Sequence, residues 1–276
     1  MATVGAPIKE LMMEHRQQVD ELLKRVNDYL QAKGDDGLKK AAADFPVDDF
    51  CALKFILSAL KKKTKVVEVA YENLTATIQF RKEYADLLQR ARETKEFKYY
   101  IPGEGGGFLG DNLLVVTYFG QTDMHELART YGSVEEIAEA GYFVSEQTRI
   151  KLDKRSLETG RLCKLLSIVD LKGMSIGKAA NRTMMSAMGI VSKSNEINTP
   201  QLLSRIIIQN APMVLSIMMS MMRPLISKST MDKIGFCGKK SSTTDISLCP
   251  FVKSFTNGIA NVPVSMGGTF REDESK

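Results

Sequence analysis

The stretch over residues 198–238 constrains the fold more than any other part of the chain. It contains a short run of mostly β-branched residues, 205–209, which is bounded by Asn210 and Pro212. A run of this length and composition predicts a strand that is buried on both faces. The ten residues after Pro212 are apolar except for two serines, until Arg223 ends the run. The stretch therefore predicts an interior strand that is followed directly by an apolar helix.

The predicted helix over residues 213–222 is apolar on nearly every side. Such a helix either lies in a protein core or faces something other than water. Five of its ten residues are methionine. Methionine side chains are unbranched and polarisable, so they adapt to changing apolar partners but specify a fixed core poorly. The residues alone leave two interpretations open, a core helix or a lid over an apolar cavity.

Length and composition are those of a soluble globular protein. The chain has 276 residues, of which 43% are hydrophobic and 26% charged, so it can bury one large core or a core plus a small domain. No run approaches the roughly 18 to 20 apolar residues that span a bilayer, and the first residues lack the apolar segment of a signal peptide. The four cysteines show no Cys-x-x-Cys spacing, which predicts reduced thiols. These features predict a cytoplasmic protein.

The spacing of apolar residues predicts several helices and three strands. The clearest helix covers residues 7–33, where an i, i+3, i+4 apolar stripe ends at Gly34. Further helices are expected over residues 46–60, about 65–92, 123–140 with an interruption at 131–133, 145–160 and 175–193. Strands are expected over residues 113–118, 162–171 and 205–209.

Residues 103–110 read GEGGGFLG and match the Gly-x-Gly-x-x-Gly pattern of dinucleotide-binding loops. That pattern needs a strand before it and a helix after it, so that phosphate meets a helix N-terminus. Here a loop precedes the glycines and the strand expected at 113–118 follows them. We therefore interpret residues 103–110 as a flexible turn without a nucleotide.

Residues suited to catalysis or metal binding are few. The two histidines, His15 and His125, each lie on a predicted amphipathic helix, and no second histidine follows His125 at the zinc-protease spacing. A small-molecule enzyme would need a cluster of titratable residues in a pocket, and the sequence does not reveal one. We expect no catalytic residue, no metal site and no cofactor.

The run from Lys61 to Lys65 concentrates part of the formal charge of +5. We interpret it as a solvated helix end. The functional alternative is an anionic membrane surface, because each basic residue near such a surface contributes roughly 1 kcal/mol. A nucleic-acid partner is not expected, since no recognition motif accompanies the run.

Several motifs occur in the order of one known family. They are Phe80-Arg81-Lys82-Glu83, Asp170-Leu171-Lys172-Gly173, Pro200, Arg205, Asn210-Ala211-Pro212, Arg223-Pro224-Leu225-Ile226 and Thr230-x-x-Lys233-Ile234. With these motifs the chain resembles the CRAL-TRIO lipid-binding family, which includes phosphatidylinositol and phosphatidylcholine transfer proteins. Residues 53–59 resemble a further family segment but lack its usual arginines. The resemblance covers about residues 50–268.

This resemblance implies an α/β fold. A helical N-terminal unit accompanies a mixed β-sheet that is flanked by helices and encloses a lipid cavity. The implied domains are residues 1–95 (helical), residues 96–270 (lipid-binding) and residues 271–276 (a disordered tail). The apolar helix becomes the gate of the cavity, and the residues implied to line the gate and the acyl chains are Met213, Ile217, Met218, Met221, Met222 and Leu225.

The resemblance also implies positions for the lipid headgroup. In inositol-lipid binders of the family, a glutamate after the proline and a threonine and a lysine beyond the gate contact the phosphoinositol group. The matching residues are Gln201, Thr230 and Lys233. Choline-lipid binders use hydroxyls on the strand before Asp170, where this chain keeps Ser167. Two of the three inositol-lipid positions are retained, which favours phosphatidylinositol and leaves phosphatidylcholine as the second candidate.

The function implied by the resemblance is the binding of one phospholipid, which is cargo rather than a cofactor. The protein would exchange this lipid between membranes or present it to a partner, without catalysis. The implied partners are a phospholipid, a transiently contacted membrane surface, and lipid kinases or other lipid-using enzymes. A lipid-sensing or scaffolding module without transfer activity is the alternative, and a small-molecule enzyme on an α/β sheet is less favoured.

Overall fold

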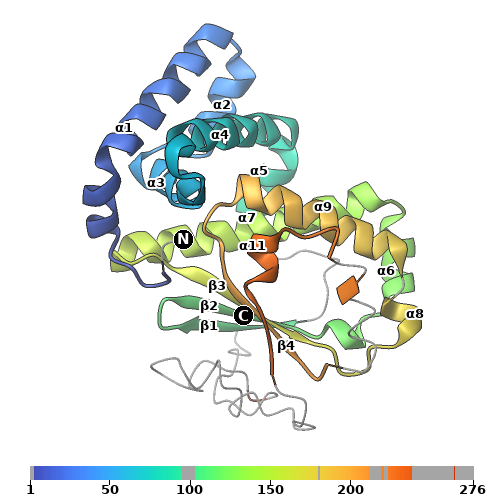
Figure 1. Ribbon diagram of the computed structural model, residues 1–276. Helices are drawn as coiled ribbons and strands as arrows, with labels where there is room; N and C mark the ends of the chain where they lie inside the picture. Colours follow the sequence, from blue (N-terminus) through green and yellow to red (C-terminus); the bar gives the residue numbers. More distant parts are fainter. Residues whose placement is uncertain are drawn as a thin grey trace. The chain divides into compact units, whose positions relative to one another are not determined.

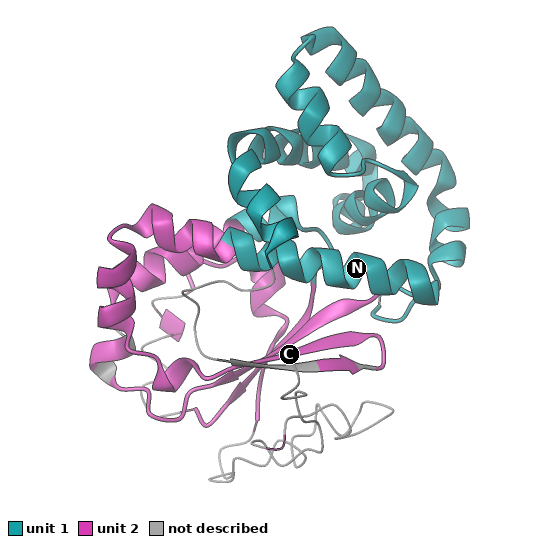
Figure 2. Ribbon diagram, turned by 180° about the vertical axis from the view of Figure 1, so that it is seen from behind, with its two compact units in different colours: residues 1–96, 142–162, 194–202 teal, residues 97–141, 163–193, 203–276 magenta. Residues whose placement is uncertain are grey.

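Two compact units make up the protein, and Figure 2 colours them separately. The computed structural model describes residues 3–94, 103–179, 181–211, 219–220, 223–237 and 264. The first unit contains residues 1–96, 142–162 and 194–202, and the second contains residues 97–141, 163–193 and 203–276. Helices build the first unit, and a mixed sheet with helices builds the second. The predicted α/β fold is therefore confirmed, while the domain boundary at residue 95 stays a prediction.

The first unit is helical. α1 ends before Gly34, as the sequence predicts. Two further helices begin at aspartate caps, because Asp35 accepts a hydrogen bond from the Leu38 backbone and Asp48 accepts one from the Cys51 backbone. The helices are α1 (Ile8–Lys33), α2 (Asp36–Asp44), α3 (Asp49–Ala59), the 3-10 helix η1 (Leu60–Lys65), α4 (Val66–Glu83), α5 (Ala85–Glu93), the later turns of α7 (Val134–Thr159) and the end of α9 (Arg182–Asn198) (Figure 1).

Two of these helices differ from the sequence-based expectation. The sequence does not predict α2, because nine residues are too few to establish an apolar period. The helix expected over residues 65–92 is two helices, since Tyr84 between them has non-helical backbone angles (φ −102°, ψ 28°). The lysines of η1 are all exposed, which agrees with a solvated helix end.

α3 lies at the centre of the core of the first unit. Only Asp49 and Ser58 of its eleven residues are not buried. A helix that is covered on all sides is expected to be apolar all round. α1 and α4 pack in the same core through fully buried residues such as Leu22 and Ile78.

A buried network of charges joins α4 to α7 within the first unit. Glu146 is 2% exposed and accepts hydrogen bonds from Arg81 at 2.5 and 3.1 Å and from Arg149 at 2.8 and 2.9 Å. Both guanidinium groups also lie over the Phe45 ring, 4.2 and 5.0 Å from its centre. Burial alone would raise the pKa of Glu146, but the hydrogen bonds and charges of the two arginines outweigh it and lower this pKa to about 2. Glu146 therefore stays ionised and paired at neutral pH.

Replacement of Glu146 by alanine should strongly destabilise the protein. The substitution leaves the buried Arg81 without its carboxylate and Arg149 with Asp153 alone, and breaking a buried pair in this way costs roughly 3–5 kcal/mol in the free energy of unfolding. Urea denaturation measures this loss. Glu21→Ala is the control, because its ion pair with Arg25 is exposed and pairs of that kind contribute up to about 1 kcal/mol. Equal losses in the two variants would contradict the role of the network.

The second unit is built on a five-stranded mixed sheet. The strands lie in chain order across the sheet. The first two pair antiparallel, and the others pair parallel. Their bounds are β1 (Gly103–Leu109), β2 (Asn112–Thr117), β3 (Lys164–Asp170), β4 (Leu203–Gln209) and β5 (Ile234–Phe236). The three strands expected from the sequence correspond to β2, β3 and β4.

The glycine-rich segment corrects one expectation. Residues 103–109 form the edge strand β1, whereas the sequence indicates a flexible turn for residues 103–110. β1 pairs with β2 along its length, with an irregularity between Gly105 and Gly107. The prediction is wrong because it rests on the local conformational preference of glycine, which disfavours strands. Hydrogen bonding to a neighbouring strand overrides that preference.

The helices of the second unit lie together on one side of the sheet, where α6, α8 and α9 can be followed in Figure 1. The break predicted at residues 131–133 is present between α6 and α7. The helices predicted on either side of residue 142 are one continuous helix, and the helix predicted over 175–193 is divided into two. The helical elements are η2 (Phe119–Gln121), α6 (Met124–Tyr131), the start of α7, α8 (Ile176–Ala179), most of α9 and α11 (Lys228–Met231).

Two further expectations concern the membrane and the thiols. Within the described residues, no helix is both long enough and apolar enough to cross a bilayer. Cys51, Cys163 and Cys237 are buried and are not part of a disulfide, and Cys249 lies outside the described residues. Burial raises the pKa of Cys51 to about 12, so this residue remains a protonated thiol at neutral pH.

Candidate functional site

The two faces of the sheet are buried to different degrees. Side chains alternate between the faces along each strand, and paired residues of neighbouring strands share a face. The closed face is buried through Asn112, Leu114, Val116, Lys164, Leu166, Ile168, Asp170, Ile207 and Gln209, although Arg205 on this face is exposed. On the open face Leu113 and Ile208 are buried, whereas other described residues are only partly buried, namely Val115, Thr117, Leu165, Ser167, Val169, Ile206 and Ile234. The second unit therefore keeps a half-exposed, mostly apolar surface on its central strands.

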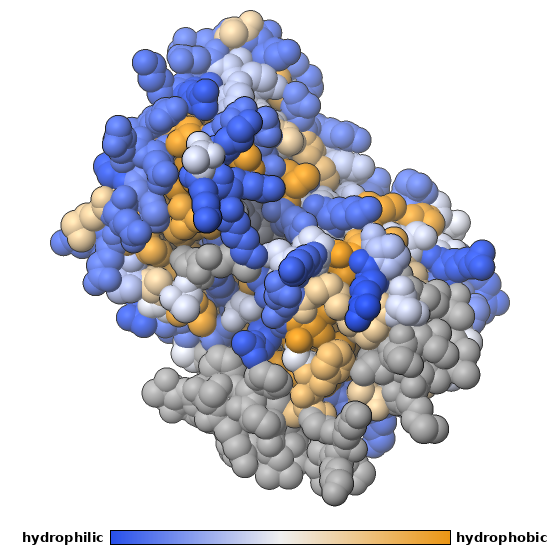
Figure 3. All heavy atoms as spheres, viewed as in Figure 1, coloured by the Kyte–Doolittle hydropathy of each residue, from blue (hydrophilic) through white to orange (hydrophobic). Residues whose placement is uncertain are grey.

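A methionine-rich cluster packs against the open face. Val169, Ile206 and Ile234 pack against a cluster in which Met184 and Met185 of α9 are buried. Figure 3 shows apolar side chains at the surface in the region of the sheet and α11. Apolar surface of this kind marks a ligand-binding or interaction site more often than an ordinary exterior. Methionines beside it allow partners of different shapes.

The predicted gate is only partly described. Leu225 packs against the methionine-rich cluster and lies close to α9. A Cβ added at Gly189 of α9 would be 2.8 Å from the Cβ of Leu225. Any larger residue at position 189 would push Leu225 away from the helix. Met219 packs against the same cluster and, like Ser220, is helical. The other predicted gate residues, Met213, Ile217, Met218, Met221 and Met222, lie outside the described residues, so the gate stays a prediction.

Three of the four predicted headgroup residues belong to the second unit. Ser167 is half-buried on the open face, in register with Val115 and Ile206. Thr230 is on α11, and its backbone N–H donates to the Ser227 hydroxyl. Lys233 follows α11, and its Nζ donates to the Leu203 carbonyl at 2.8 Å.

Thr230 and Lys233 are also joined to each other. The Lys233 N–H donates to the Thr230 carbonyl at 3.0 Å. Both residues therefore lie near the amino ends of the parallel strands, while Ser167 lies in the middle of β3.

Gln201 belongs to the first unit. It is 8% exposed and has a left-handed backbone conformation with φ 63°. Its Nε2 donates to the Ser58 hydroxyl at 3.1 Å. Ser58 is in the segment where the family's usual arginines are missing. Gln201, which replaces the glutamate of the family pattern, is thus hydrogen-bonded to the segment that lacks those arginines.

Lys164 is a residue of interest that the sequence motifs do not indicate. It begins β3 and is 4% exposed. Burial and the nearby charge of Lys233 lower the pKa of Lys164 to about 8. The sequence contains one signal that could have identified Lys164, which is its position inside a segment with the pattern of a buried strand. Lysine is almost never fully buried without a compensating group.

Comparisons with known proteins agree with this geometry. The model of the family described as the CRAL/TRIO domain matches residues 111–254, just over half of the chain. The chain belongs to the CRAL/TRIO family. Its structure is similar to the crystal structure of Sfh5, with a TM-score of 0.50 and 13% sequence identity over 80% of each chain, which shows a shared fold. A search of curated protein sequences finds no match.

The CRAL/TRIO match indicates a general role for the domain that it covers. The matched residues include β2 to β5 and leave out α1 to α5. Proteins of this family bind small lipophilic ligands. The open face and the methionine-rich cluster are therefore the candidate lipid site of this CRAL/TRIO domain.

A small network fixes the carboxyl ends of the strands in the CRAL/TRIO domain. Asp170 accepts hydrogen bonds through Oδ1 from the Lys172 backbone at 2.9 Å and from the Asn210 side chain at 2.8 Å. Asn210 has φ 50°, a conformation that asparagine tolerates better than most residues. Gly120 approaches this turn so closely that a Cβ there would lie 2.3 Å from the Lys172 carbonyl oxygen. The network fixes the point at which the chain leaves β4.

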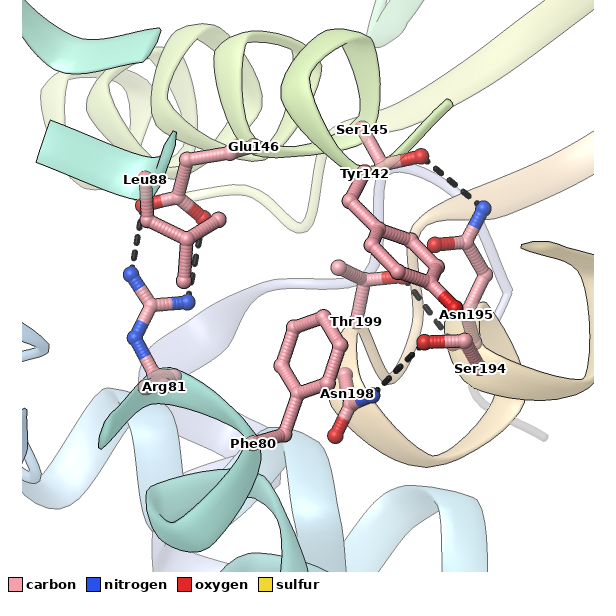
Figure 4. A pocket seen from close by; sticks show the side chains of 10 residues that line it. All are labelled: Phe80, Arg81, Leu88, Tyr142, Ser145, Glu146, Ser194, Asn195, Asn198 and Thr199. Carbon is pink, nitrogen blue, oxygen red and sulfur yellow. Dashed lines mark hydrogen bonds and ion pairs between the residues drawn. The ribbon is translucent and has the colours of Figure 1, made fainter. Parts of the chain in front are cut away.

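A recess in the first unit differs from the open face. It is lined by Phe80, Arg81, Leu88, Tyr142, Ser145, Glu146, Ser194, Asn195, Asn198 and Thr199 (Figure 4). Several of its polar groups bond to one another, since Asn195 donates to Ser145 and Asn198 donates to Ser194. Its volume is about 240 Å³ including space that is open to solvent. This is below the roughly 300–1,000 Å³ of pockets for drug-sized ligands, so the recess is too small for a two-chain phospholipid.

Replacement of Lys164 by methionine should stabilise the ligand-free protein at neutral pH. The pKa of Lys164 is near 8 in the folded protein, against 10.5 for an unperturbed lysine side chain. Its charge therefore opposes folding below pH 8, and this effect fades as the pH rises toward 10.5. We expect Lys164→Met to raise the free energy of unfolding at pH 7 by roughly 1–3 kcal/mol.

Urea denaturation at pH 7 and pH 10 measures this difference. The gain should nearly vanish at the higher pH, because the folded wild-type protein no longer carries the charge there. A Lys164→Met variant that is less stable than the wild type at pH 7 would contradict the prediction.

Proposed function

We propose that this CRAL/TRIO protein holds one phospholipid at a time and exchanges it between membranes or presents it to a partner. The observation that supports the proposal is the half-buried apolar face of the central strands beside the methionines of α9. The acyl chains lie along Val169 and Ile206, where apolar contact replaces contact with water. No bond is made or broken in this function.

The headgroup contacts follow from two side chains near the amino ends of the strands. Lys233 supplies a cation for the lipid phosphate, and Thr230 supplies a hydroxyl. Gln201 has an amide in place of a carboxylate, and this amide already donates to Ser58. Phosphatidylinositol is the favoured lipid because Thr230 and Lys233 are retained. Phosphatidylcholine is the second candidate, with the Ser167 hydroxyl as its contact.

Exchange or presentation brings the protein to a membrane surface. The exposed lysines of η1 suit an anionic bilayer, and each such residue near the surface contributes roughly 1 kcal/mol. A lipid kinase or another lipid-using enzyme is the partner class that presentation would serve. A sensing or scaffolding module would bind lipid without moving it, and a transfer assay between two vesicle populations separates these roles.

The cargo of the purified protein tests the proposal directly. Native mass spectrometry before and after denaturation should show one phospholipid per chain, which is released on unfolding. Protein that carries no lipid is then incubated with vesicles of phosphatidylinositol and phosphatidylcholine and measured again. A bound nucleotide, or no lipid even after incubation, would overturn the proposal.

A phenylalanine at position 167 should block the site without unfolding the protein. The added ring occupies space on the open face that an acyl chain needs, so Ser167→Phe should lose most of its lipid uptake from vesicles. If that face were ordinary core, the same substitution would overpack it and cost about 1–3 kcal/mol of stability. Ile168→Phe is the matched control, because Ile168 is fully buried on the closed face. Equal destabilisation of both variants would favour plain core.

Removal of the Lys233 amine should act on anionic lipid selectively. Lys233→Ala should weaken phosphatidylinositol binding by roughly 1.5–3 kcal/mol, the scale of a hydrogen bond to a charged group. Binding of phosphatidylcholine should fall less, because the choline cation of this lipid offsets the charge of its phosphate. Transfer assays with each lipid, accompanied by thermal unfolding, measure the two effects. Unchanged phosphatidylinositol transfer would remove Lys233 from the site.

A further inference from the structure

Thr64 lies within the run of exposed lysines in η1. The segment over residues 60–65 reads Leu-Lys-Lys-Lys-Thr-Lys, and none of its residues is buried. Thr64 is exposed to solvent, and so are Lys61, Lys62, Lys63 and Lys65. The nearest acidic residue along the chain, Glu68, pairs with Lys65 at 3.6 Å. A hydroxyl group is therefore present at the surface among four positive charges.

The Thr64 hydroxyl differs from those of several other threonines on helices. Thr75, Thr130 and Thr148 each donate their hydroxyl to the backbone carbonyl four residues earlier in their helix. Within the described part of the chain, the side chain of Thr64 makes no such hydrogen bond. Its Oγ1 is therefore accessible to an enzyme, and no hydrogen bond to those residues has to be broken before it reacts.

The backbone around Thr64 is irregular. η1 is a 3-10 helix of six residues, and Lys63 within it has φ 46° and ψ −82°, far from helical values. Runs of 3-10 helix longer than three or four residues are uncommon, because their hydrogen bonds are poorly aligned. Local opening is easiest where a segment buries few side chains. This segment can therefore be extended more readily than α3 or α4, the helices that it joins.

The charge pattern before Thr64 indicates the class of enzyme. Three lysines directly precede the threonine. Protein kinases distinguish their substrates by patterns of charge, and a kinase with an acidic substrate groove complements a basic segment of this kind. A phosphate on a threonine carries a charge of about −1.5 to −2 at pH 7. On Thr64 it would offset up to about half of the positive charge of the four lysines.

We propose that Thr64 is a phosphorylation site that weakens the contact between η1 and an anionic membrane. A protein kinase transfers the γ-phosphoryl group of ATP to Thr64 Oγ1. A phosphorus–oxygen bond forms at Oγ1, the bond from the γ-phosphorus to the β-phosphate oxygen breaks, and ADP and the hydroxyl proton are released. This inference rests on the membrane contact in the proposed function and adds a means of regulating it.

Phosphorylation of Thr64 would act on the membrane contact and not on the lipid site. η1 belongs to the first unit, whereas the open face of the sheet belongs to the second. The phosphate would cancel charge only on the surface that attracts anionic lipid. Release from a membrane would therefore leave the lipid cargo in place.

The expected change in membrane affinity follows from the charges. Each basic residue near an anionic surface strengthens binding roughly fivefold, so a phosphate that offsets nearly two of them should weaken binding to anionic vesicles by roughly 10- to 30-fold. The effect should shrink as the salt concentration rises, because salt screens exposed charges. Binding to neutral vesicles should not change.

The test uses the full chain as the wild type and as Thr64→Ala. Each protein is incubated with ATP and a protein kinase that selects basic sequences, and mass spectrometry locates the phosphate. Sedimentation with vesicles of phosphatidylcholine, with and without phosphatidylserine, then measures membrane binding. We expect kinase treatment to modify Thr64 and to weaken binding of the wild type to the anionic vesicles. The same treatment should leave the binding of Thr64→Ala unchanged.

A second pair of variants tests the effect of charge without the kinase. Thr64→Glu adds one negative charge inside the lysine run and should weaken binding to anionic vesicles roughly fivefold. Gln17→Glu is the matched control, because it adds the same charge at an exposed position of α1. The control should bind as the wild type does. Thermal unfolding of each variant shows whether the fold is retained.

Each outcome supports the inference or overturns it. If Thr64 is not modified, or if its modification leaves the affinity for anionic vesicles unchanged, the inference is overturned while the proposed function stands. If the unmodified wild type binds anionic vesicles no more tightly than neutral ones, the membrane contact of η1 fails as well. Native mass spectrometry of the same samples measures the lipid cargo separately. Phosphorylation that weakens membrane binding and leaves the cargo in place supports the inference.

Discussion

The parallel pairing of β2, β3 and β4 is the constraint on which the candidate site depends. The closed face of these strands is buried almost completely, so its apolar side chains fix the register of the sheet. A slip by one residue would exchange the two faces and expose Leu166, Ile168 and Ile207 to the side that is now half-open. Because that exchange is so costly, Ser167 and Val169 are held on the open face. The open face can therefore remain incompletely packed without loss of the fold.

Much of the fold could be predicted from the sequence, because its strongest local signals agree with its tertiary structure. The β-branched run before Asn210 and the segment before Asp170 are strands in the structure, as their composition indicates. The apolar stripe that ends at Gly34 is α1. The order of the motifs also predicted the family correctly. These features depend on residues that are close in sequence, which is why periodicity and motif order identify them.

The remaining features depend on contacts between distant residues. β1 is a strand because β2 provides its hydrogen bonds, and no local property of its glycines indicates that. Gln201 meets Ser58 across 143 residues of sequence. Lys164 and Asn112 become neighbours only through strand register, and Lys233 reaches the same edge from beyond the predicted gate. Sequence motifs could therefore suggest Thr230 and Lys233 as binding residues, but could not show which other groups surround them.

The network at Asp170 has a mechanical consequence for the segment that follows β4. Asn210 donates a side-chain hydrogen bond to Asp170 of the neighbouring strand and has an uncommon left-handed backbone conformation. Two separate restraints therefore fix the direction in which the chain leaves the sheet. Because one residue supplies both restraints, a single substitution at Asn210 would remove the hydrogen bond to Asp170 together with the side chain that tolerates this backbone conformation.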